Sequence, residues 1–328
     1  MDNANGHVVS YSSMKNLVFT LLLAFPSFAA EWPNLTASER RFRLAELTAM
    51  PWGGEVKESK PKEVKGCVLS KVTIKVRSPE GKSWNFKFDL VRPKGVKKTP
   101  LVMVLPTIER LTPLEPTIAY QLCKANYSVA VIDANDNSQP DNLPAWGHED
   151  LVLRKTILTL RTIIDWAQTD VRFYKTKIGL FGHSLGGITS SLMAGVEPQR
   201  LKAIVVAVGA GNMPGILTHS IYPRVALLRW RRFAAIRNMS SEDYEKELQK
   251  HLRYDPLMFA KRVKTENLYF VMASWDQSVP YEYQLETHQA FGSPDYHTFS
   301  PGTHIDGLIR LATIDFDKVV GFLDARLK

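Results

Sequence analysis

The residues whose types and spacing could do chemistry lie in the stretch KIGLFGHSLGGI, Lys177–Ile188. A serine, Ser184, stands between Gly182 and Gly186, with an apolar run before it and a helix-forming stretch after it. Side chains at the glycine positions would collide in so sharp a strand-to-helix turn, and the turn would hold the serine oxygen in the open. Such a hydroxyl acts as a nucleophile when a base takes its proton. A purely structural glycine-rich corner is the alternative interpretation.

A helix that begins directly after Ser184 would stabilise negative charge at this serine. The amino-terminal end of a helix carries partial positive charge and unpaired N–H groups. We therefore expect the backbone N–H of Leu185 to donate a hydrogen bond to the oxyanion that forms when the serine attacks a carbonyl group. A third glycine, Gly187, follows and strengthens the pattern.

The glycine-flanked serine between a strand and a helix resembles the nucleophile turn of the α/β-hydrolase superfamily, in particular of its serine esterase and dienelactone-hydrolase-like branch. The resemblance extends roughly from Cys67 to the carboxyl terminus. It implies an acid after a late strand and a histidine after the next strand. Asp276 in LYFVMASWDQSVP fits the acid, since D-x-x-V-P is typical of such enzymes, and His304 in YHTFSPGTH fits the base. The resemblance thus implies a catalytic triad of Ser184, His304 and Asp276.

Other acids and histidines fit these two roles less well. The alternative position for the acid, after the preceding strand, reads GAGNM and holds no carboxylate. Asp306 is expected to cap the last helix, His297 to lie inside the last strand, and the side chain of His183 to point away from the nucleophile.

The second oxyanion donor is expected in the loop after LVMVL, which reads PTIER, Pro106–Arg110. Lipases of the resembling family often have His-Gly-Gly at this place and this chain does not, but any backbone N–H can serve. Thr107 or Ile108 is the candidate donor. Glu109 and Arg110 either line the pocket entrance or form a surface ion pair.

A sheet covered by helices must position these residues. Five continuous apolar runs predict strands buried on both faces, which are typical of a parallel sheet. They are Leu101–Leu105, Ser128–Asp133, Ile178–Gly182, Ala203–Gly209 and Leu268–Ser274. Helices are expected over Glu149–Thr169, Leu185–Val196 and, closing the chain, roughly Leu308–Lys328. The alternation predicts a mostly parallel wound α/β sheet.

Two further segments modify this sheet. Lys71–Arg77 and Trp84–Leu90 alternate apolar and polar residues, which predicts an amino-terminal antiparallel hairpin. More than fifty residues separate the last two apolar runs, far more than a plain crossover needs. We expect a helical cap insertion at about 212–263 over the carboxyl edge of the sheet. A capped helix in it should begin at SSED, Ser240–Asp243.

The segment MKNLVFTLLLAFPSFAAE, Met14–Glu31, is typical of an export signal. It has a lysine, an apolar stretch too short to span a bilayer, and Ser27 and Ala29 in a small-x-small cleavage pattern. We expect residues 1–29 to be an extension and signal peptide that is cleaved near Ala29. Residues 30–328 should form one domain that is exported to the periplasm or secreted. An ordinary buried or disordered segment is the alternative.

Cysteine content and charge suggest an environment but leave alternatives open. An oxidising compartment would allow Cys67 and Cys123 to pair, and two unpaired, partly buried thiols are the alternative. The formal net charge is +9, and it stays +9 without residues 1–29, which hold one Asp and one Lys. RWRRF, Arg229–Phe233, could support weak association with an anionic surface, or the charge could be a generic basic surface. No nucleic-acid motif occurs, so we expect no nucleic-acid partner.

The expected function is a serine hydrolase, most simply a carboxylic ester hydrolase acting on a small-molecule ester through an acyl-enzyme. Relatives of the resembling family that have Asp or Cys in place of Ser184 do other chemistry, so the serine favours acyl transfer. A serine peptidase or amidase of the same fold is one alternative. Prolyl oligopeptidase-type enzymes usually carry a large amino-terminal propeller, and fewer than seventy residues precede the predicted hairpin here. The other alternative to an ester hydrolase is a catalytically silent surface-binding relative. No cofactor and no metal are expected.

Overall fold

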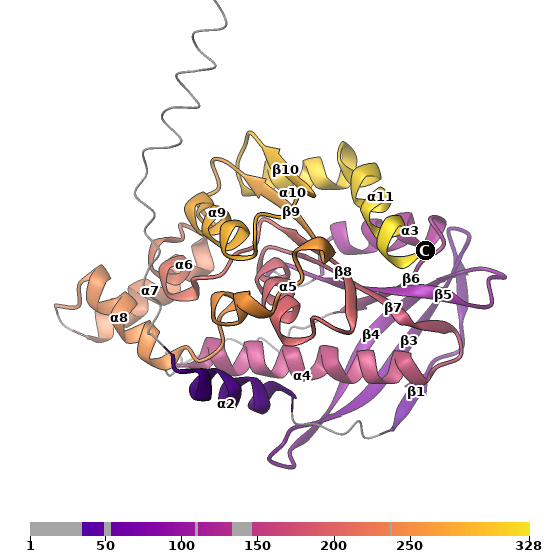
Figure 1. Cartoon of the computed structure of the whole chain (residues 1–328), viewed down its shortest axis with the longest axis horizontal. Helices are drawn as coiled ribbons and strands as arrows, with labels where there is room; N and C mark the ends of the chain where they lie inside the picture. Colours follow the sequence, from indigo (N-terminus) through magenta and orange to yellow (C-terminus); the bar gives the residue numbers. More distant parts are fainter. Residues whose placement is uncertain (1–34, 49–53, 109–110, 133–145, 237) are drawn as a thin grey trace, which may run out of the picture. The chain divides into compact units, whose positions relative to one another are not determined.

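The computed structural model describes residues 35–48, 54–108, 111–132, 146–236 and 238–328. These residues belong to one unit, Leu35–Lys328, whose described part is built round a ten-stranded sheet (Figure 1). The predicted export signal at residues 1–29 lies outside the described residues, as do Glu109 and Arg110. None of the described helices combines the length and the apolar character needed to cross a bilayer.

An antiparallel hairpin opens the sheet, as the alternating pattern predicts. β3 (Cys67–Arg77) and β4 (Ser83–Pro93) pair along their whole length. Every second residue of β3 from 72 to 76 is buried, because alternate side chains of a strand point to the same face. Two short strands, β1 (Val56–Glu58) and β2 (Lys62–Val64), pair antiparallel with β3.

The five apolar runs form strands of one sheet, in the order β1-β3-β4-β6-β5-β7-β8-β9-β10, and every pair from β6 onward is parallel. The five strands are β5 (Thr99–Leu105), β6 (Ser128–Ile132), β7 (Phe173–His183), β8 (Leu201–Ala207) and β9 (Leu268–Ala273), and a short strand, β10 (His297–Ser300), follows β9 at the edge. All residues of β5, β6 and β9 are buried, which confirms strands covered on both faces. The carboxyl ends of the parallel strands therefore meet at one edge.

Helices cover both faces of the sheet (Figure 1). α4 (His148–Thr169) and α5 (Leu185–Val196) pack on one face, and α2 (Ala37–Thr48) packs on α4. α3 (Leu114–Lys124) and α11 (Phe316–Leu327) cover the other face, where side chains of both helices join one buried cluster with residues of β5, β7 and β8. The mostly parallel wound α/β sheet is thus confirmed.

The prediction of a single closing helix is wrong. Two helices occupy this segment, α10 (His304–Thr313) and α11, and α10 begins before the predicted start at Leu308. The break falls at Asp315, whose buried carboxylate accepts hydrogen bonds from Arg310 Nε at 2.6 Å and from Lys318 Nζ at 2.7 Å. These bonds hold the corner between the helices.

The interval between β8 and β9 is mostly helical. It contains α6 (Met213–His219), α7 (Pro223–Ala235), α8 (Ser241–His251) and two 3-10 helices, η1 (Pro256–Arg262) and η2 (Thr265–Asn267). We call α6, α7 and α8 the cap. Ser240 and Asp243 form the predicted capping box at the start of α8, with Asp243 N–H donating to Ser240 Oγ at 3.0 Å. In contrast to the cap, η1 packs against α5 of the main fold.

Cys67 and Cys123 form a disulfide, which resolves the two alternatives that the sequence leaves open. The bridge joins the first residue of β3 to α3 across a sequence separation of 56 residues. Both cysteines are buried.

Candidate active site

The turn that holds Ser184 leads from β7 straight into α5. Ser184 has φ 57° and ψ −121°, a backbone conformation that is costly for a residue with a side chain. Its backbone N–H donates to the carbonyl oxygen of Ala207 at 2.9 Å, which fixes the turn to the end of β8. The strained residue is therefore held from the neighbouring strand.

The glycines on either side of Ser184 allow close approach of backbones. A Cβ atom at Gly182 would lie 2.0 Å from the carbonyl oxygen of Gly186, and one at Gly186 would lie 2.5 Å from the carbonyl oxygen of Leu105. Both obstacles are backbone atoms, so any side chain would displace the turn. The spacing Gly-x-Ser-x-Gly is thus a steric requirement of this corner.

His304 and Asp276, the predicted base and acid, are joined by a hydrogen bond. His304 Nδ1 donates to Asp276 Oδ2 at 2.6 Å, and both residues are buried. Asp276 lies in the loop between β9 and α9 (Tyr281–Ala290), and His304 is the first residue of α10, after β10. Loops at the same edge of adjacent parallel strands thus bring together two residues that are 28 positions apart.

Further donors hold the Asp276 carboxylate in place. Oδ1 accepts from the backbone N–H groups of Ser278 at 2.8 Å and Val279 at 3.0 Å, and Oδ2 also accepts from Gln284 Nε2 at 2.9 Å. Gln284 is fully buried and also donates to the carbonyl oxygen of Val279 at 2.7 Å. The sequence reasoning missed Gln284, because nothing in its spacing from Asp276 marks an amide that orients the acid.

Ser184 lies at the same edge of the sheet as this pair. His183 at the end of β7 is in register with Ala207 of β8, which is level with Val271 of β9, and Val271 is level with Thr298 of β10. The three loops that carry the serine, the acid and the histidine therefore leave the sheet at nearly the same level.

The start of α10 also packs against the end of β8. A Cβ atom on Gly307 would lie 2.8 Å from Cγ1 of Val208, which directly follows β8, the strand next to β7. No hydrogen bond joins Ser184 Oγ to His304 in the described part of the chain. In ligand-free structures such bonds are often long, and they shorten when a substrate is bound.

The predicted oxyanion donors are placed differently from one another. Leu185 is the first residue of α5, so the helix offers no acceptor to its backbone N–H. Leu185 and Ile108 both line the pocket that contains Ser184, whereas Thr107 is absent from its lining. The structure thus places Leu185 and Ile108 at the pocket that contains the serine.

Two hydrogen-bonded attachments hold the loop of Ile108 against the serine turn. On one flank, the N–H of Gly186 donates to the carbonyl oxygen of Pro106 at 3.0 Å. On the other flank, His183 Nε2 is bonded to Glu115 Oε1 at 2.8 Å, and both side chains are fully buried. The side chain of His183 is thus engaged with Glu115 of α3, and it ties the residue before the nucleophile to that helix.

Glu115 also holds the end of the same loop. Its Oε2 accepts from the backbone N–H of Thr112 at 2.6 Å and from Thr112 Oγ1 at 2.8 Å, and Leu114 N–H donates to Thr112 Oγ1 at 3.2 Å. Burial raises the pKa of Glu115, but the hydrogen bonds to His183 and Thr112 and the charge of His183 outweigh burial, and the net pKa is lowered. The spacing Thr112-x-x-Glu115 is the sequence signal that could have identified this residue.

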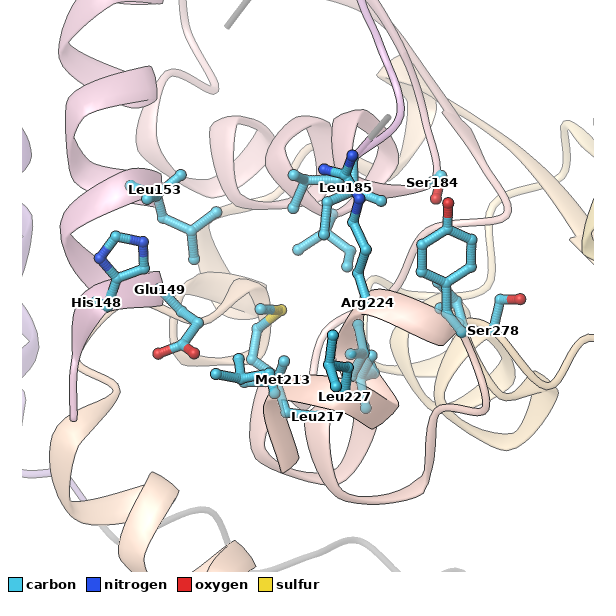
Figure 2. A pocket seen from close by; sticks show the side chains of 18 of the residues that line it. His148, Glu149, Leu153, Ser184, Leu185, Met213, Leu217, Arg224, Leu227 and Ser278 are labelled. Carbon is cyan, nitrogen blue, oxygen red and sulfur yellow. The ribbon is translucent and has the colours of Figure 1, made fainter. Parts of the chain in front are cut away.

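The pocket at Ser184 runs beneath the cap. Figure 2 shows Ser184 and Ser278 on one side of it and His148 and Glu149 on the other, with apolar side chains between them. Twelve of its nineteen lining residues are apolar. Such a concave, apolar space with a nucleophile at one end fits the site of a small-molecule enzyme.

A buried ion pair attaches the cap to the main fold. Arg232 of α7 is 1% exposed, and its Nη2 donates to the two carboxylate oxygens of Glu149 in α4 at 3.0 and 3.3 Å. Its Nη1 donates to the hydroxyl oxygen of Tyr244 in α8 at 3.2 Å, and its guanidinium lies 4.7 Å from the ring centre of Trp146. The neighbouring Arg229 donates to backbone carbonyl groups of the cap.

Comparison with solved structures defines the fold. An acetyl xylan esterase from a Paenibacillus species aligns with a TM-score of 0.69 at 16% identity, over 90% of this chain and 96% of that chain. The chain has the α/β-hydrolase fold. An acetyl xylan esterase from a Thermoanaerobacterium species aligns with a TM-score of 0.64 at 16% identity, over 87% and 92% of the two chains. An acylaminoacyl peptidase from Pyrococcus horikoshii gives 0.54 at 15% identity, over 83% of this hydrolase and 42% of that chain.

A family comparison agrees with the site. Residues 160–304 of the hydrolase match a model described as the prolyl oligopeptidase family, a stretch that is less than half of the chain and includes Ser184, Asp276 and His304. No curated protein matches the chain. With the serine turn and the hydrogen-bonded His304–Asp276 pair, the comparisons identify a serine hydrolase of the α/β fold and leave esterase and peptidase activity open.

Proposed function

We propose that the protein is a carboxylic ester hydrolase that acts through Ser184, His304 and Asp276. One observation carries the proposal. The strained serine opens into an apolar pocket, at the sheet edge where a histidine is hydrogen-bonded to a buried carboxylate. A structural glycine corner needs neither the pocket nor the pair.

The geometry supports the following steps. Because Asp276 accepts the Nδ1–H of His304, the other ring nitrogen has a free lone pair and can take the proton of Ser184 Oγ. The serine oxygen attacks the ester carbonyl, and the N–H groups of Leu185 and Ile108 stabilise the oxyanion. The alcohol leaves with the proton from His304, and water then cleaves the acyl-enzyme by the same steps in reverse.

The second candidate is a serine peptidase or amidase. The description of the matched family and the Pyrococcus horikoshii neighbour favour it. The names of other aligned structures, among them the two acetyl xylan esterases, favour an ester, and so does the apolar pocket, which offers few partners to a polar peptide. We therefore place ester hydrolysis first.

The decisive experiment compares esters and amides with Ser184→Ala as the test variant. We expect the wild-type protein to react with a fluorophosphonate probe and to hydrolyse p-nitrophenyl esters faster than aminoacyl p-nitroanilides. Ser184→Ala should lose probe labelling and several orders of magnitude of turnover. Ser190→Ala is the matched control, because Ser190 is a buried serine of α5, the helix that begins directly after Ser184. Unchanged turnover in Ser184→Ala would refute the proposal.

We also propose export to the periplasm or the medium, with cleavage near Ala29. The signal-like segment supports it, and so does the Cys67–Cys123 disulfide, since such bridges persist in oxidising compartments. Fractionation of expressing cells and mass spectrometry of the mature amino terminus test this proposal. A protein that stays uncleaved in the cytoplasm contradicts it.

Association with an anionic surface is a weaker proposal. Of the arginines in the RWRRF segment, Arg232 is buried and Arg229 is bonded to the cap, so that Arg231 is the exposed cation. Exposed Trp230 beside it could still contact lipid. Co-sedimentation with anionic vesicles tests this. Strong vesicle binding without probe labelling would instead favour a catalytically silent surface-binding protein.

A further inference from the structure

The pocket beneath the cap extends from the serine toward the start of α4. It begins at Ser184 and ends at His148 and Glu149, the first two residues of α4. Figure 2 shows Leu185, Met213, Leu217 and Leu227 between these ends, supplied by α5, α6 and α7. The charged lining residues other than Glu149 are Arg224 and Arg231, which come from α7. We call this space the slot.

The slot does not include the proton donor for the leaving group. Neither His304 nor Asp276 is among its lining residues, although Ser184, Leu185 and Ile108 are. The alcohol must leave beside His304, because that histidine supplies its proton. The slot therefore lies on the opposite side of the ester carbonyl, where the acyl chain is attached.

The length of the slot can be estimated from α7. Its lining residues run from Arg224 to Arg231, seven positions that correspond to about 10 Å of helix. With C–C bonds of about 1.5 Å and angles of about 111°, an extended chain gains about 1.25 Å per carbon. About eight carbons therefore fit along the slot. An acetyl group on Ser184 would leave most of it without apolar contact.

A fixed polar group, the Glu149 carboxylate, lies at the far end of the slot. Glu149 accepts two hydrogen bonds from Arg232, and Arg232 is in turn held by Tyr244 and Trp146. A longer chain would have to push its apolar end against this ion pair, which would lose hydrogen bonds that nothing replaces. The slot therefore sets an upper as well as a lower limit on chain length.

We propose that the slot selects esters of medium-chain fatty acids, with an optimum near six to ten acyl carbons, over acetyl and long-chain esters. This inference rests on the proposed ester hydrolysis. It concerns the acyl side alone, so the length of an alkyl alcohol should matter little. Each methylene that leaves water for apolar contact is worth about fourfold in binding, so the four methylenes that hexanoate adds to acetate should raise kcat/KM by about 250-fold when all four are buried.

The test is a chain-length series of p-nitrophenyl esters from acetate to palmitate, with alkyl acetates of rising alcohol length beside it. Leu217→Trp and Met213→Trp should shorten the slot and lower the octanoate-to-acetate ratio of kcat/KM at least tenfold. Ile221→Trp is the matched control, since Ile221 is 60% exposed and outside the lining, and its ratio should equal that of the wild type. Thermal unfolding and fluorophosphonate labelling establish that each variant is folded.

The outcomes separate this inference from the proposed function. Ser184-dependent hydrolysis that is fastest for acetate, or that depends on alcohol length and not on acyl length, overturns the slot and keeps the esterase. An unchanged ratio in both tryptophan variants also overturns it. Loss of Ser184-dependent ester hydrolysis altogether overturns both. An optimum at six to ten carbons that shifts to shorter esters in the two variants supports the slot.

Discussion

Replacing Glu115 should uncouple the oxyanion loop from the serine turn. In Glu115→Ala, Thr112 loses the carboxylate to which its N–H and Oγ1 donate, which costs about 1 kcal/mol, and the fully buried His183 loses its only hydrogen-bonded partner among the described residues, which costs about 1–3 kcal/mol. The free energy of unfolding should therefore fall by about 2–4 kcal/mol. Urea unfolding followed by fluorescence measures it.

The effect on turnover should be distinct from the effect on stability. A displaced Ile108 N–H would weaken oxyanion stabilisation, and complete loss of one such donor costs about 100- to 1000-fold in kcat. Because the Gly186–Pro106 hydrogen bond still holds the other flank of the loop, we expect a smaller loss of about 10- to 100-fold. KM should change less than kcat, because the oxyanion that this N–H stabilises forms only in the transition state.

A matched control exists on α2. Glu39 accepts a similar pair of hydrogen bonds, with Thr36 N–H and Oγ1 donating to its Oε2 at 2.7 and 2.8 Å, but it is exposed and has no histidine partner in the described chain. Glu39→Ala should destabilise less than Glu115→Ala and leave kcat unchanged. If folded Glu115→Ala keeps full kcat, or if Glu39→Ala lowers it equally, the positioning role of Glu115 is refuted.

Three further predictions follow from other contacts. Asp276→Asn should lower kcat about 10,000-fold while the fold is kept, because the amide favours the wrong tautomer of His304; ester turnover and a thermal melt measure both. Replacing Cys67 and Cys123 by alanine should lower the free energy of unfolding by about 4 kcal/mol in the loop-entropy treatment, and equal urea midpoints would contradict this. Burial raises the pKa of Asp150 from 3.8 to about 6, so its stabilising contribution is complete below about pH 4 and is lost as the pH rises through 6. The free energy of unfolding of the wild type should therefore decrease by up to about 3 kcal/mol between pH 4 and 7 on account of Asp150. In Asp150→Asn this decrease should be absent, and urea unfolding at a series of pH values measures it.

Most of the sheet could be predicted because its strands are buried on both faces. Leu101–Leu105 and Leu268–Ser274 are unbroken apolar runs, and every residue of β5 and β9 is buried. The closing helix was mispredicted because its apolar periodicity continues past Asp315, whereas the break depends on that carboxylate's contacts with Arg310 and Lys318. Such contacts depend on three-dimensional placement that periodicity does not encode.

The residues of the site also fall into those that the sequence predicts and those that it does not. Ser184 is marked by its glycines, since steric crowding restricts the residue type at each neighbouring position. The spacing Thr112-x-x-Glu115 marks only the local contact of Glu115 with Thr112. The hydrogen bonds from Gln284 to Asp276 and between Glu115 and His183 join different elements, and a single sequence has no pattern for those. For the same reason, the sequence does not decide whether Cys67 and Cys123 pair, because their pairing depends on how α3 packs beside β3.

The ion pair of Glu149 with Arg232 at the far end of the slot is also the attachment of the cap, and this has a consequence for specificity. Glu149 belongs to α4 of the main fold, and Arg232 belongs to α7, which supplies one side of the slot. A substitution that shortens or removes either side chain would therefore lengthen the slot and break this ion pair at once. Because breaking a buried ion pair leaves one charge uncompensated, the same change would also destabilise the cap. Longer acyl chains cannot be admitted at this end without a loss of cap stability, unless both partners are replaced together by apolar residues of similar volume.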